Sequence, residues 1–303
     1  MLPAVATAQV SWTEIQKPNS LYDQINWPVY PTGDSGLLLC LVSDPDGLYH
    51  SSDDGQTWTR NTINLKFPYL WPRLASTHQS LIPFLTCSRD GLYRVDPESG
   101  KSHRIPALDS IVVTWVAATP DGQRICVLGN SVLEARLLFI SEDSGASWKR
   151  ISVQDVEFSP QIASAVFTQD TLRISAYNRV IWMLAPGETT LHPVHHSLPQ
   201  SNAPLWFLGD GLILMEYDSM IVRSNDNGET WRDTRTGLPS GPVSLHACAR
   251  SSDGTVYALI NDGDQYDRLF RSSDRGRTWN RIDRDGDPRI TRFQLTTHGE
   301  VVM

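Results

Sequence analysis

The sequence predicts an all-β fold in which small antiparallel sheets repeat around a closed ring, and three observations lead to it. An eight-residue motif, S-x-D-x-G-x-[ST]-W, occurs four times in the 303 residues. A short strand-like segment precedes and follows every copy. The copies start 90, 83 and 48 residues apart, so two gaps are close to double periods and one is close to a single period. The copies span residues 51–58, 141–148, 224–231 and 272–279.

Each copy is predicted to be the turn of a β-hairpin, and we name these four segments the repeat turns. The Asp and Ser side chains can hydrogen-bond to the backbone amides of the turn. The Gly permits a positive φ angle, and the Trp gives the following strand a large apolar anchor. The residues expected to build the turns are Asp53, Gly55, Trp58, Asp143, Gly145, Trp148, Asp226, Gly228, Trp231, Asp274, Gly276 and Trp279.

Degenerate copies fill the two long gaps. Residues 90–105 (DGLYRVDPESGKSHRI) align with residues 46–61 (DGLYHSSDDGQTWTRN) after one insertion. Residues 180–190 (VIWMLAPGETT) keep the strand and Gly187 but lose the Asp and the Trp. The period is therefore expected to continue through both gaps.

The two ends of the chain are predicted to share one sheet. Residues 9–15 (QVSWTEI) repeat the end of the motif, with Trp12 lying 46 residues before Trp58. Residues 289–303 match the two strands that open other units, such as residues 113–129. We therefore expect seven four-stranded sheets, with the N-terminal segment forming the outer strand of the last one and closing the ring.

This arrangement is a seven-bladed β-propeller formed by residues 1–303 as one domain. The third strand of the seventh blade would have to come from residues 1–6 or be missing, and a six-bladed ring is the alternative. The repeat turns join the third strand of a blade to the outer fourth strand, and they define what we name the turn face. The loops that join second to third strands, and one blade to the next, lie on the opposite side, the funnel face.

The repeat turns resemble Asp boxes, also called BNR repeats, and nearly the whole chain resembles the Asp-box β-propeller superfamily. That group includes sialidases, xyloglucanases, sortilin-type receptors and photosystem II assembly-factor-like proteins. The resemblance implies the fold but no single function, because members include both hydrolases and binding scaffolds. In this superfamily the box lies opposite the usual ligand funnel. The resemblance therefore implies a structural role for the repeat turns.

One stretch, HRIP at 103–106, looks like the sialidase R-I-P motif, whose Arg helps to grip a substrate carboxylate. Arg104 falls two residues past the Trp position of the repeat, where Arg60, Arg150 and Arg281 also fall. We therefore expect Arg104 on an outer strand rather than in a pocket. The sialidase motif should also precede the first box, whereas here it follows one.

An enzyme of this kind would be a glycan-active, sialidase-like hydrolase with acid and base residues on the funnel face. The segment MEYDS places Glu216, Tyr217 and Asp218 there, and a Tyr beside a Glu could serve as a nucleophile with its base. Arg73 is a candidate for gripping a carboxylate. Ordinary polar hairpin loops explain the same residues, and the sequence favours that interpretation.

No metal or cofactor site is expected. Asp262, Asp264 and Asp267 offer oxygen ligands that suit Ca²⁺, but they lack the full D-x-[DN]-x-[DN]-G run, so calcium is left open at this one place. The histidines form no H-E-x-x-H array. The sequence holds no G-x-S-x-G motif, phosphate-binding loop or dinucleotide fingerprint.

Aromatic residues gather at one level of the predicted propeller. Four blades place a Trp near the start of the inner strand, and the long funnel-face loops 16–26, 61–70, 151–161 and 192–205 carry Tyr and Phe. The tryptophans either grip a ligand or pack between blades, and strand alternation favours packing. Aromatic, Pro-stiffened loops suit a protein surface or an oligosaccharide. The expected binding residues are Trp27, Phe67, Tyr69, Trp71, Arg73, Trp115 and Trp206.

The composition excludes some classes of binding partner. A formal net charge of -8 and a pI of about 5.4 argue against nucleic acid, and no apolar run is long enough to span a membrane. The ATA-Q step near the N-terminus resembles a signal-peptidase site without the apolar stretch that should precede it. The compartment stays open, with a slight preference for an extracytoplasmic one. For Cys40, Cys87, Cys126 and Cys248 the sequence favours buried thiols over disulfides.

These observations together favour a non-enzymatic binding or assembly propeller. We expect a monomer that engages a protein partner through its funnel-face loops, with an oligosaccharide as the other ligand class considered. The alternative is the glycan-active hydrolase.

Overall fold

The structure of the chain is a computed structural model. It describes residues 30–32, 37–43, 46–53, 56–61, 73–75, 84–87, 91–96, 99, 101–119, 121–131, 134, 137–152, 162–168, 170–176, 180–194, 205–264, 266–284, 290, 293–295 and 301–302. Residues 9–15, the expected closing strand, lie outside these ranges.

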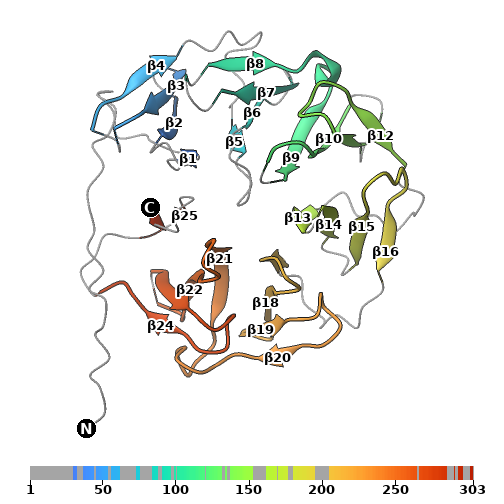
Figure 1. Cartoon of the computed structure of the whole chain (residues 1–303). Coiled ribbons are helices and arrows are strands. Elements are labelled where there is room, and N and C mark those ends of the chain that lie inside the picture. Colours follow the sequence, from blue (N-terminus) through green and yellow to red (C-terminus); the bar gives the residue numbers. More distant parts are fainter. Residues whose placement is uncertain are drawn as a thin grey trace.

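The described residues form six four-stranded antiparallel sheets and one two-stranded sheet, arranged around a ring (Figure 1). Sheets one to three comprise β1 (Tyr30–Thr32), β2 (Leu37–Ser43), β3 (Asp46–Ser51), β4 (Thr59–Asn61), β5 (Arg73–Ala75), β6 (Phe84–Cys87), β7 (Gly91–Val95), β8 (Ser102–Arg104), β9 (Val112–Ala118), β10 (Ile125–Asn130), β11 (Leu137–Ser141) and β12 (Lys149–Ile151). Sheets four to six comprise β13 (Ile162–Thr168), β14 (Thr171–Ala176), β15 (Ile181–Leu184), β16 (His192–Val194), β17 (Trp206–Phe207), β18 (Ile213–Tyr217), β19 (Met220–Ser224), β20 (Arg232–Asp233), β21 (Ser244–Arg250), β22 (Val256–Asn261), β23 (Arg268–Ser272) and β24 (Asn280–Arg281).

The remaining two strands, β25 (Gln294–Leu295) and β26 (Val301–Val302), pair antiparallel as the predicted C-terminal inner strands. Strand β25 contacts both β21 of sheet six and β1 of sheet one. The two-stranded sheet therefore lies in the ring between the last and the first four-stranded sheets.

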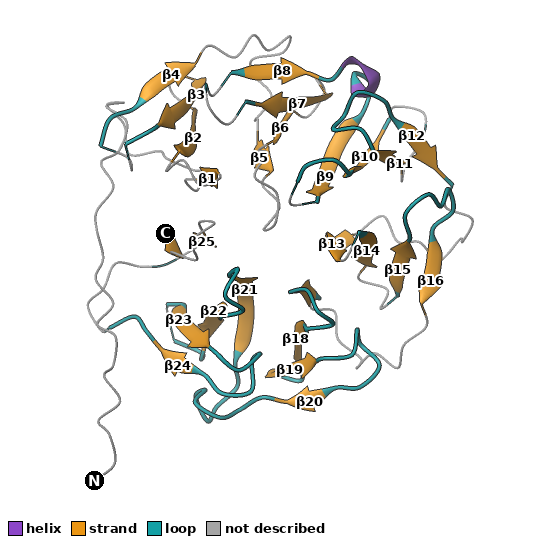
Figure 2. Ribbon diagram, in the orientation of Figure 1, coloured by secondary structure: helices purple, strands orange, loops and turns teal. Residues whose placement is uncertain are grey.

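The predicted hairpins are confirmed at every repeat turn. Each turn joins the third strand of a sheet to its outer fourth strand, as β11 to β12 and β23 to β24. The degenerate copies join β7 to β8 and β15 to β16 in the same way. A single turn of 3₁₀ helix, Pro106–Leu108, follows β8 (Figure 2), and Pro at its first position supplies the required φ.

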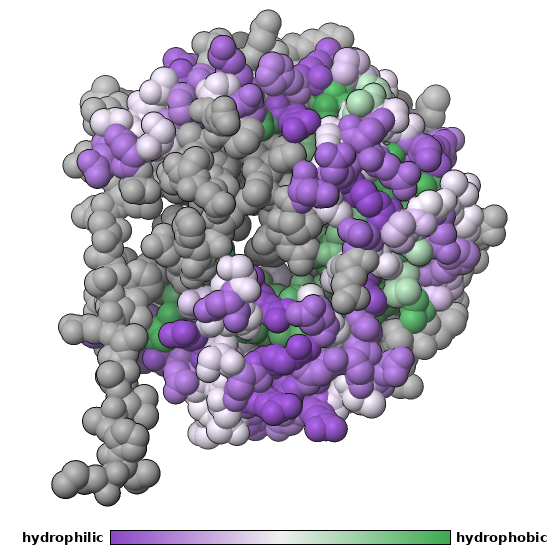
Figure 3. Space-filling view, viewed as in Figure 1, coloured by the Kyte–Doolittle hydropathy of each residue, from purple (hydrophilic) through white to green (hydrophobic). Residues whose placement is uncertain are grey.

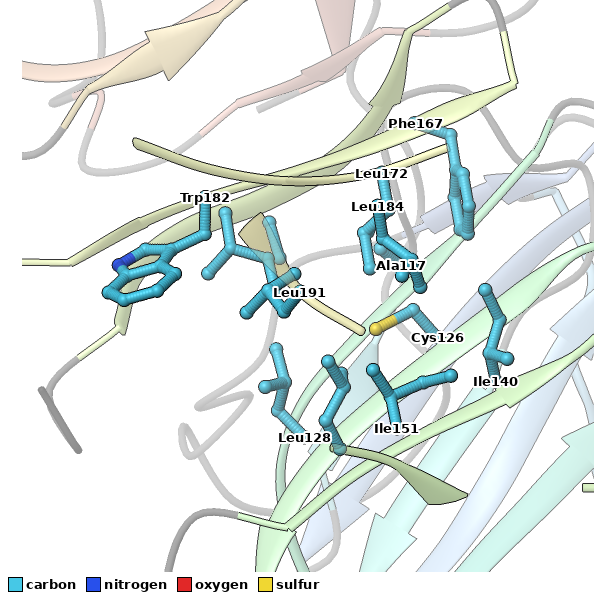
Figure 4. Close-up of a cluster of buried hydrophobic side chains, with 13 residues drawn as sticks. Ala117, Cys126, Leu128, Ile140, Ile151, Phe167, Leu172, Trp182, Leu184 and Leu191 are labelled. Carbon is cyan, nitrogen blue, oxygen red and sulfur yellow. The ribbon is translucent and has the colours of Figure 1, made fainter. Parts of the chain in front are cut away.

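The core is divided into layers between successive sheets. Figure 4 shows the layer between sheets three and four, where Cys126 and Leu128 of β10 meet Phe167 and Leu184. The alternate residues of β10, beginning with Ile125, pack on the opposite side against sheet two. Both faces of a sheet are therefore apolar, which explains why the strands give continuous apolar runs rather than alternation.

The motif tryptophans anchor these layers, as predicted. Trp148 packs in the layer between sheets two and three, and Trp231 in the layer between sheets four and five. Trp279 is 2% exposed in the layer between sheets five and six. Each of these indoles therefore fills the space between its own sheet and the preceding one.

Two further findings concern the composition. Cys126 and Cys248 are free, buried thiols, as expected. Within the described ranges no helix has the length and apolar character needed to cross a membrane.

Candidate functional site

The repeat turns share one hydrogen-bond arrangement, which the structure shows in all four copies. In the first turn, Ser51 Oγ donates to Asp53 Oδ1 at 2.7 Å, Thr57 N donates to the same oxygen at 2.8 Å, and Thr57 Oγ1 donates to Oδ2 at 2.6 Å. The same three bonds recur around Asp143, Asp226 and Asp274. Both carboxylate oxygens are therefore occupied by the turn itself.

These bonds favour the ionised carboxylate. The hydroxyl and amide of Thr57 lower the pKa of Asp53 to about 2, and those of Ser147 lower the pKa of Asp143 to about 2. For Asp274 burial raises the pKa, but the amide and hydroxyl of Thr278 outweigh it and the pKa falls to about 2. The carboxylates are tuned for holding a turn and not for proton transfer near neutral pH.

The backbone of the turns is more unusual than the sequence indicates. The predicted positive φ is found at Gly145, Gly228 and Gly276, at 90°, 96° and 74°. The residue before each glycine, Ser144, Asn227 or Arg275, also has a positive φ. Gly55 lies outside the described residues. Two consecutive left-handed residues allow the Ser hydroxyl to reach the Gly amide, as in the bond from Gly145 N to Ser141 Oγ at 2.7 Å.

On the funnel face, the side chain of the candidate acid Glu216 forms a hydrogen bond that joins two sheets. Its Oε2 accepts a hydrogen bond from the Leu245 amide of sheet six at 3.1 Å. A second hydrogen bond joins the same two segments, because the Val243 amide donates to the Ser219 carbonyl at 2.9 Å. The hairpin of β18 and β19 is therefore fastened to the first strand of the next sheet.

The neighbours of Glu216 have separate roles. Tyr217 packs against the layer between sheets four and five, on the side of the sheet opposite to Leu245. Adjacent strand residues point to opposite faces, so Glu216 and Tyr217 are not brought together as a base and its nucleophile. Asp218 and Ser219, with φ of 48° and 58°, are the two central residues of the hairpin loop, since Tyr217 pairs with Met220.

The acidic cluster of the next hairpin is bound by its own neighbours. Asp267 Oδ2 lies 2.9 Å from His246 Nδ1, and Asp267 Oδ1 accepts from Asn261 Nδ2 at 3.1 Å. Asp264 pairs with Arg268 at 3.8 Å. Across the described ranges, no group of three or more His, Cys, Asp or Glu side chains is placed to hold a metal ion.

The tryptophans of the inner strands occupy inter-sheet layers where the structure describes them. Trp115 of β9 packs on the layer between sheets three and four, and its Nε1 donates to the Ala165 carbonyl of sheet four at 3.2 Å. Trp206 packs between sheets five and six. This placement favours the packing interpretation. Trp27, Phe67, Tyr69 and Trp71 lie outside the described residues, and Arg73 is described only as the first residue of β5.

Arg104 lies where the repeat register places it, at the end of outer strand β8, where it pairs with Tyr93. Its Nε is 3.1 Å from Asp109 Oδ1. The HRIP segment is thus part of the rim of the ring and of the turn that follows it, and the prediction of an outer-strand residue is confirmed.

Sequence reasoning missed a set of arginines that join neighbouring sheets on the turn face. Arg94 Nη1 donates to the Ser144 carbonyl of the next repeat turn at 3.2 Å. Arg250 Nη1 bonds Asp210 Oδ2 at 2.7 Å, and Arg275 Nη2 donates to the Asp210 carbonyl at 2.7 Å. For Arg94 a signal was present, because the position just before the turn's first residue is basic in four sheets, at His50, Arg94, Arg223 and Arg271. Arg250 and Arg275 lie at other positions of the repeat.

The fold is similar to that of solved β-propellers. The chain aligns with YCF48 bound to D1 peptide at 16% identity and a TM-score of 0.60, over 95% of this chain and 91% of that one. It aligns with YCF48 from Cyanidioschyzon merolae at 14% identity and a TM-score of 0.58, over 91% and 93%. For an ancestral GH74 enzyme the values are 14% and 0.56, over 84% of this chain and 38% of that one.

No protein-family model and no curated protein matches the sequence. At such low identities the likeness to solved structures establishes the fold alone. The chain is an all-β propeller with four-stranded antiparallel blades.

Proposed function

We propose that this chain is a non-enzymatic binding or assembly propeller that engages a protein partner through its funnel-face loops. The observation that carries the proposal is that the candidate carboxylates of the funnel face are already hydrogen-bonded to neighbouring groups of the protein. Glu216 holds a backbone amide of the adjacent sheet, and Asp267 holds His246 and Asn261. Acid and base groups that are committed to the scaffold support binding rather than hydrolysis.

The similar structures support the same class of function. One neighbour that matches nearly the full length of both chains is a propeller bound to a peptide. The ancestral GH74 enzyme is matched over 84% of this chain but over only 38% of its own. The hydrolase alternative needs a nucleophile beside Glu216, and the candidate Tyr217 faces the other side of its sheet.

The proposal includes the finer architecture. We infer one propeller domain over residues 1–303 with seven blades, in which residues 9–15 complete the sheet begun by β25 and β26. The repeat turns are assigned to the Asp-box class because their Ser, Asp and Thr side chains close the turn on itself. The partner would contact loops 16–27, 61–73, 151–161 and 192–206, which carry the Tyr, Phe and Trp residues that dominate binding energy.

The test separates the two functions with one loop variant and one isosteric control. Partner capture by the purified chain should be weakened about 30-fold or more by Phe67→Ala with Tyr69→Ala, a loss of roughly 2 kcal/mol. Glu216→Gln should bind as the unchanged chain does, because the amide oxygen of Gln can still accept from Leu245 N. Hydrolysis of a glycan panel that disappears in Glu216→Gln would overturn the proposal.

A further inference from the structure

Four arginines gather on the turn face where sheets five and six meet. Arg223 of β19 and Arg232 of β20 stand directly opposite each other in the antiparallel pairing. Arg275 and Arg277 flank Gly276 of the next repeat turn, and a Cβ atom at Gly276 would lie 3.7 Å from Arg223 Cδ. The side chains of two sheets therefore bring four positive charges to one seam, in a protein whose net charge is -8. Figure 3 shows a hydrophilic surface around β19 and β20.

Arg223 is the buried member of this group. It is 6% exposed, and its Nε and Nη1 are buried without a hydrogen-bond partner among the described residues. The equivalent Arg94 of sheet two donates to a carbonyl of the next repeat turn, so the position can be satisfied. Burial, and then the charges of Arg277 and Arg232, lower the pKa of Arg223. A buried, unbonded guanidinium among like charges is costly.

The acidic groups of the seam are already engaged. Asp274 uses both oxygens on Ser272 and Thr278. Asp210 pairs with Arg250 at 2.7 Å. Within the part of the chain that the structure describes, the side chains of Arg223, Arg232 and Arg277 form no ion pair. Arg275 is fixed in place by bonds to Asn225 Oδ1 at 3.1 Å and to the Asp210 carbonyl at 2.7 Å.

We propose that this seam is a binding site for a phosphate-class oxyanion, with Arg223 donating from inside the seam and Arg232, Arg275 and Arg277 surrounding the anion at the surface. Guanidinium groups donate in a fixed fork that matches tetrahedral oxyanions. The four arginines together with Asp274 give the seam a net charge of +3. A dianion therefore neutralises more of this charge than a single carboxylate does. The site lies on the face opposite the proposed partner loops and stands independently of them.

Titration calorimetry with the whole chain tests the site, using inorganic phosphate, sulfate and acetate at one ionic strength. We expect saturable phosphate binding with a dissociation constant below about 10 mM. Sulfate should bind similarly and acetate more weakly, because charge and geometry both favour the tetrahedral dianion. Arg223→Met, which fills the same space without charge, should bind phosphate at least about tenfold more weakly. Arg232→Gln with Arg277→Gln, changed only at exposed positions, should do the same.

Arg235→Gln is the matched control, since Arg235 belongs to the same segment but pairs with Asp233 at 3.5 Å. It should bind phosphate as the unchanged chain does. In chloride buffer without phosphate, Arg223→Met should melt no lower than the unchanged chain, because it removes an unpaired buried charge. Absence of saturable phosphate binding, acetate binding as strong as phosphate, or phosphate binding within threefold of the unchanged chain in both arginine variants would overturn the site.

Discussion

At the scale of single residues, the aspartate of the repeat turn explains why the motif is so strict. The turn presents two donors from one residue, the amide and the hydroxyl of Thr278 for example, and one more from Ser272. An ionised carboxylate offers two acceptor oxygens and no donor, which satisfies these three and also the Arg277 amide, which donates to Asp274 Oδ1 at 3.0 Å. Asn would place its NH2 group where Thr278 Oγ1 donates, so that hydroxyl would have to rotate and accept, and the negative charge that strengthens the bonds would be lost. The Ser, the Asp and the Ser or Thr therefore have to occur together.

Asp274→Ala tests this account. The substitution leaves the Thr278 amide and hydroxyl without their acceptor, so we expect the free energy of unfolding to fall by about 1–2 kcal/mol. Asp264→Ala is the control, because the exposed Asp264 side chain makes, among the described residues, only a 3.8 Å ion pair with Arg268. This substitution should change stability by less than about 0.5 kcal/mol. Urea denaturation of both variants provides the measurement. Equal stability of the two variants would refute the structural role.

The same carboxylates predict how acid weakens the fold. The folded-state pKa of Asp53 is about 2, below the value of about 3.9 for an unfolded Asp. The unfolded state therefore binds more protons in between, and the stabilisation present above about pH 4 is lost as the pH falls towards 2. The urea midpoint of Asp53→Asn should lie below that of the unchanged chain at pH 6, and the two should converge near pH 2. A constant difference across this range would contradict the expectation.

At the scale of single residues, the sequence could reveal only those features that depend on a residue type recurring at the same position of the repeat. Asp, Gly and Trp recur at fixed positions, and their bonds were predictable from turn chemistry. The second left-handed residue, Ser144 in one turn and Arg275 in another, has no shared side chain because the backbone conformation is imposed by its neighbours. The pairing of Arg275 with Asp210 joins residues 65 positions apart, and only the ring geometry brings them together.

At the scale of elements, the outer strands hold consecutive sheets together. The segment after β20 continues to the repeat turn of sheet six, where Thr236 bridges Thr278 and the Trp279 amide donates to the Thr236 carbonyl at 2.9 Å. Ser152 and Thr190 bridge sheets three and four in the same way. Thr234 Oγ1 donates to the Gly276 carbonyl and accepts from the Trp279 indole. At the rim of the ring, consecutive sheets are therefore joined by hydrogen bonds as well as by packing.

Among the described glycines, Gly237 leaves the least room for a side chain. Its φ is +85°, and a Cβ atom there would lie 1.8 Å from the Trp279 carbonyl oxygen. Gly237→Ala should therefore lower the free energy of unfolding by at least about 2 kcal/mol, from backbone strain and displacement of the turn. Gly241→Ala, four residues on, meets nothing within 4 Å and should be tolerated. Thermal melting of the two variants distinguishes them, and similar melting temperatures would show that the rim is not tightly joined.

The elements themselves were largely predictable because both signals were local. Hairpin turns with fixed chemistry separated apolar runs of strand length. β7 and β15 fall within the degenerate copies, and β25 falls in the C-terminal segment that matched the inner strands of other units. The use of Glu216 was not predictable, since its partner amide belongs to another sheet. A polar hairpin residue reads the same in sequence whether it faces solvent, a ligand or the next sheet.

At the scale of the whole molecule, ring closure decides whether the apolar sheet faces are all covered. Sheet six presents Ala249, Leu259 and Leu269 to the C-terminal segment, and Ile290 and Phe293 are each 5% exposed against them. Strand β25 also contacts β1. The two strands β25 and β26 are thus wedged between sheets six and one, but a two-stranded sheet alone is marginal in water. We therefore expect residues 9–15 to add an outer strand to this sheet.

Removal of residues 1–15 tests that closure. If residues 9–15 form the outer strand of the last sheet, the deletion removes Trp12 and exposes a sheet edge, so the free energy of unfolding should fall by several kcal/mol. Deletion of residues 1–8 alone spares this outer strand and Trp12, and it should lower the free energy of unfolding much less. Hydrogen exchange adds a local measurement, because the amides of β26 should lose protection in the longer deletion while those of β10 keep theirs. Identical melting and exchange in the two deletions would mean that the ring closes through its C-terminal strands without the N-terminal segment.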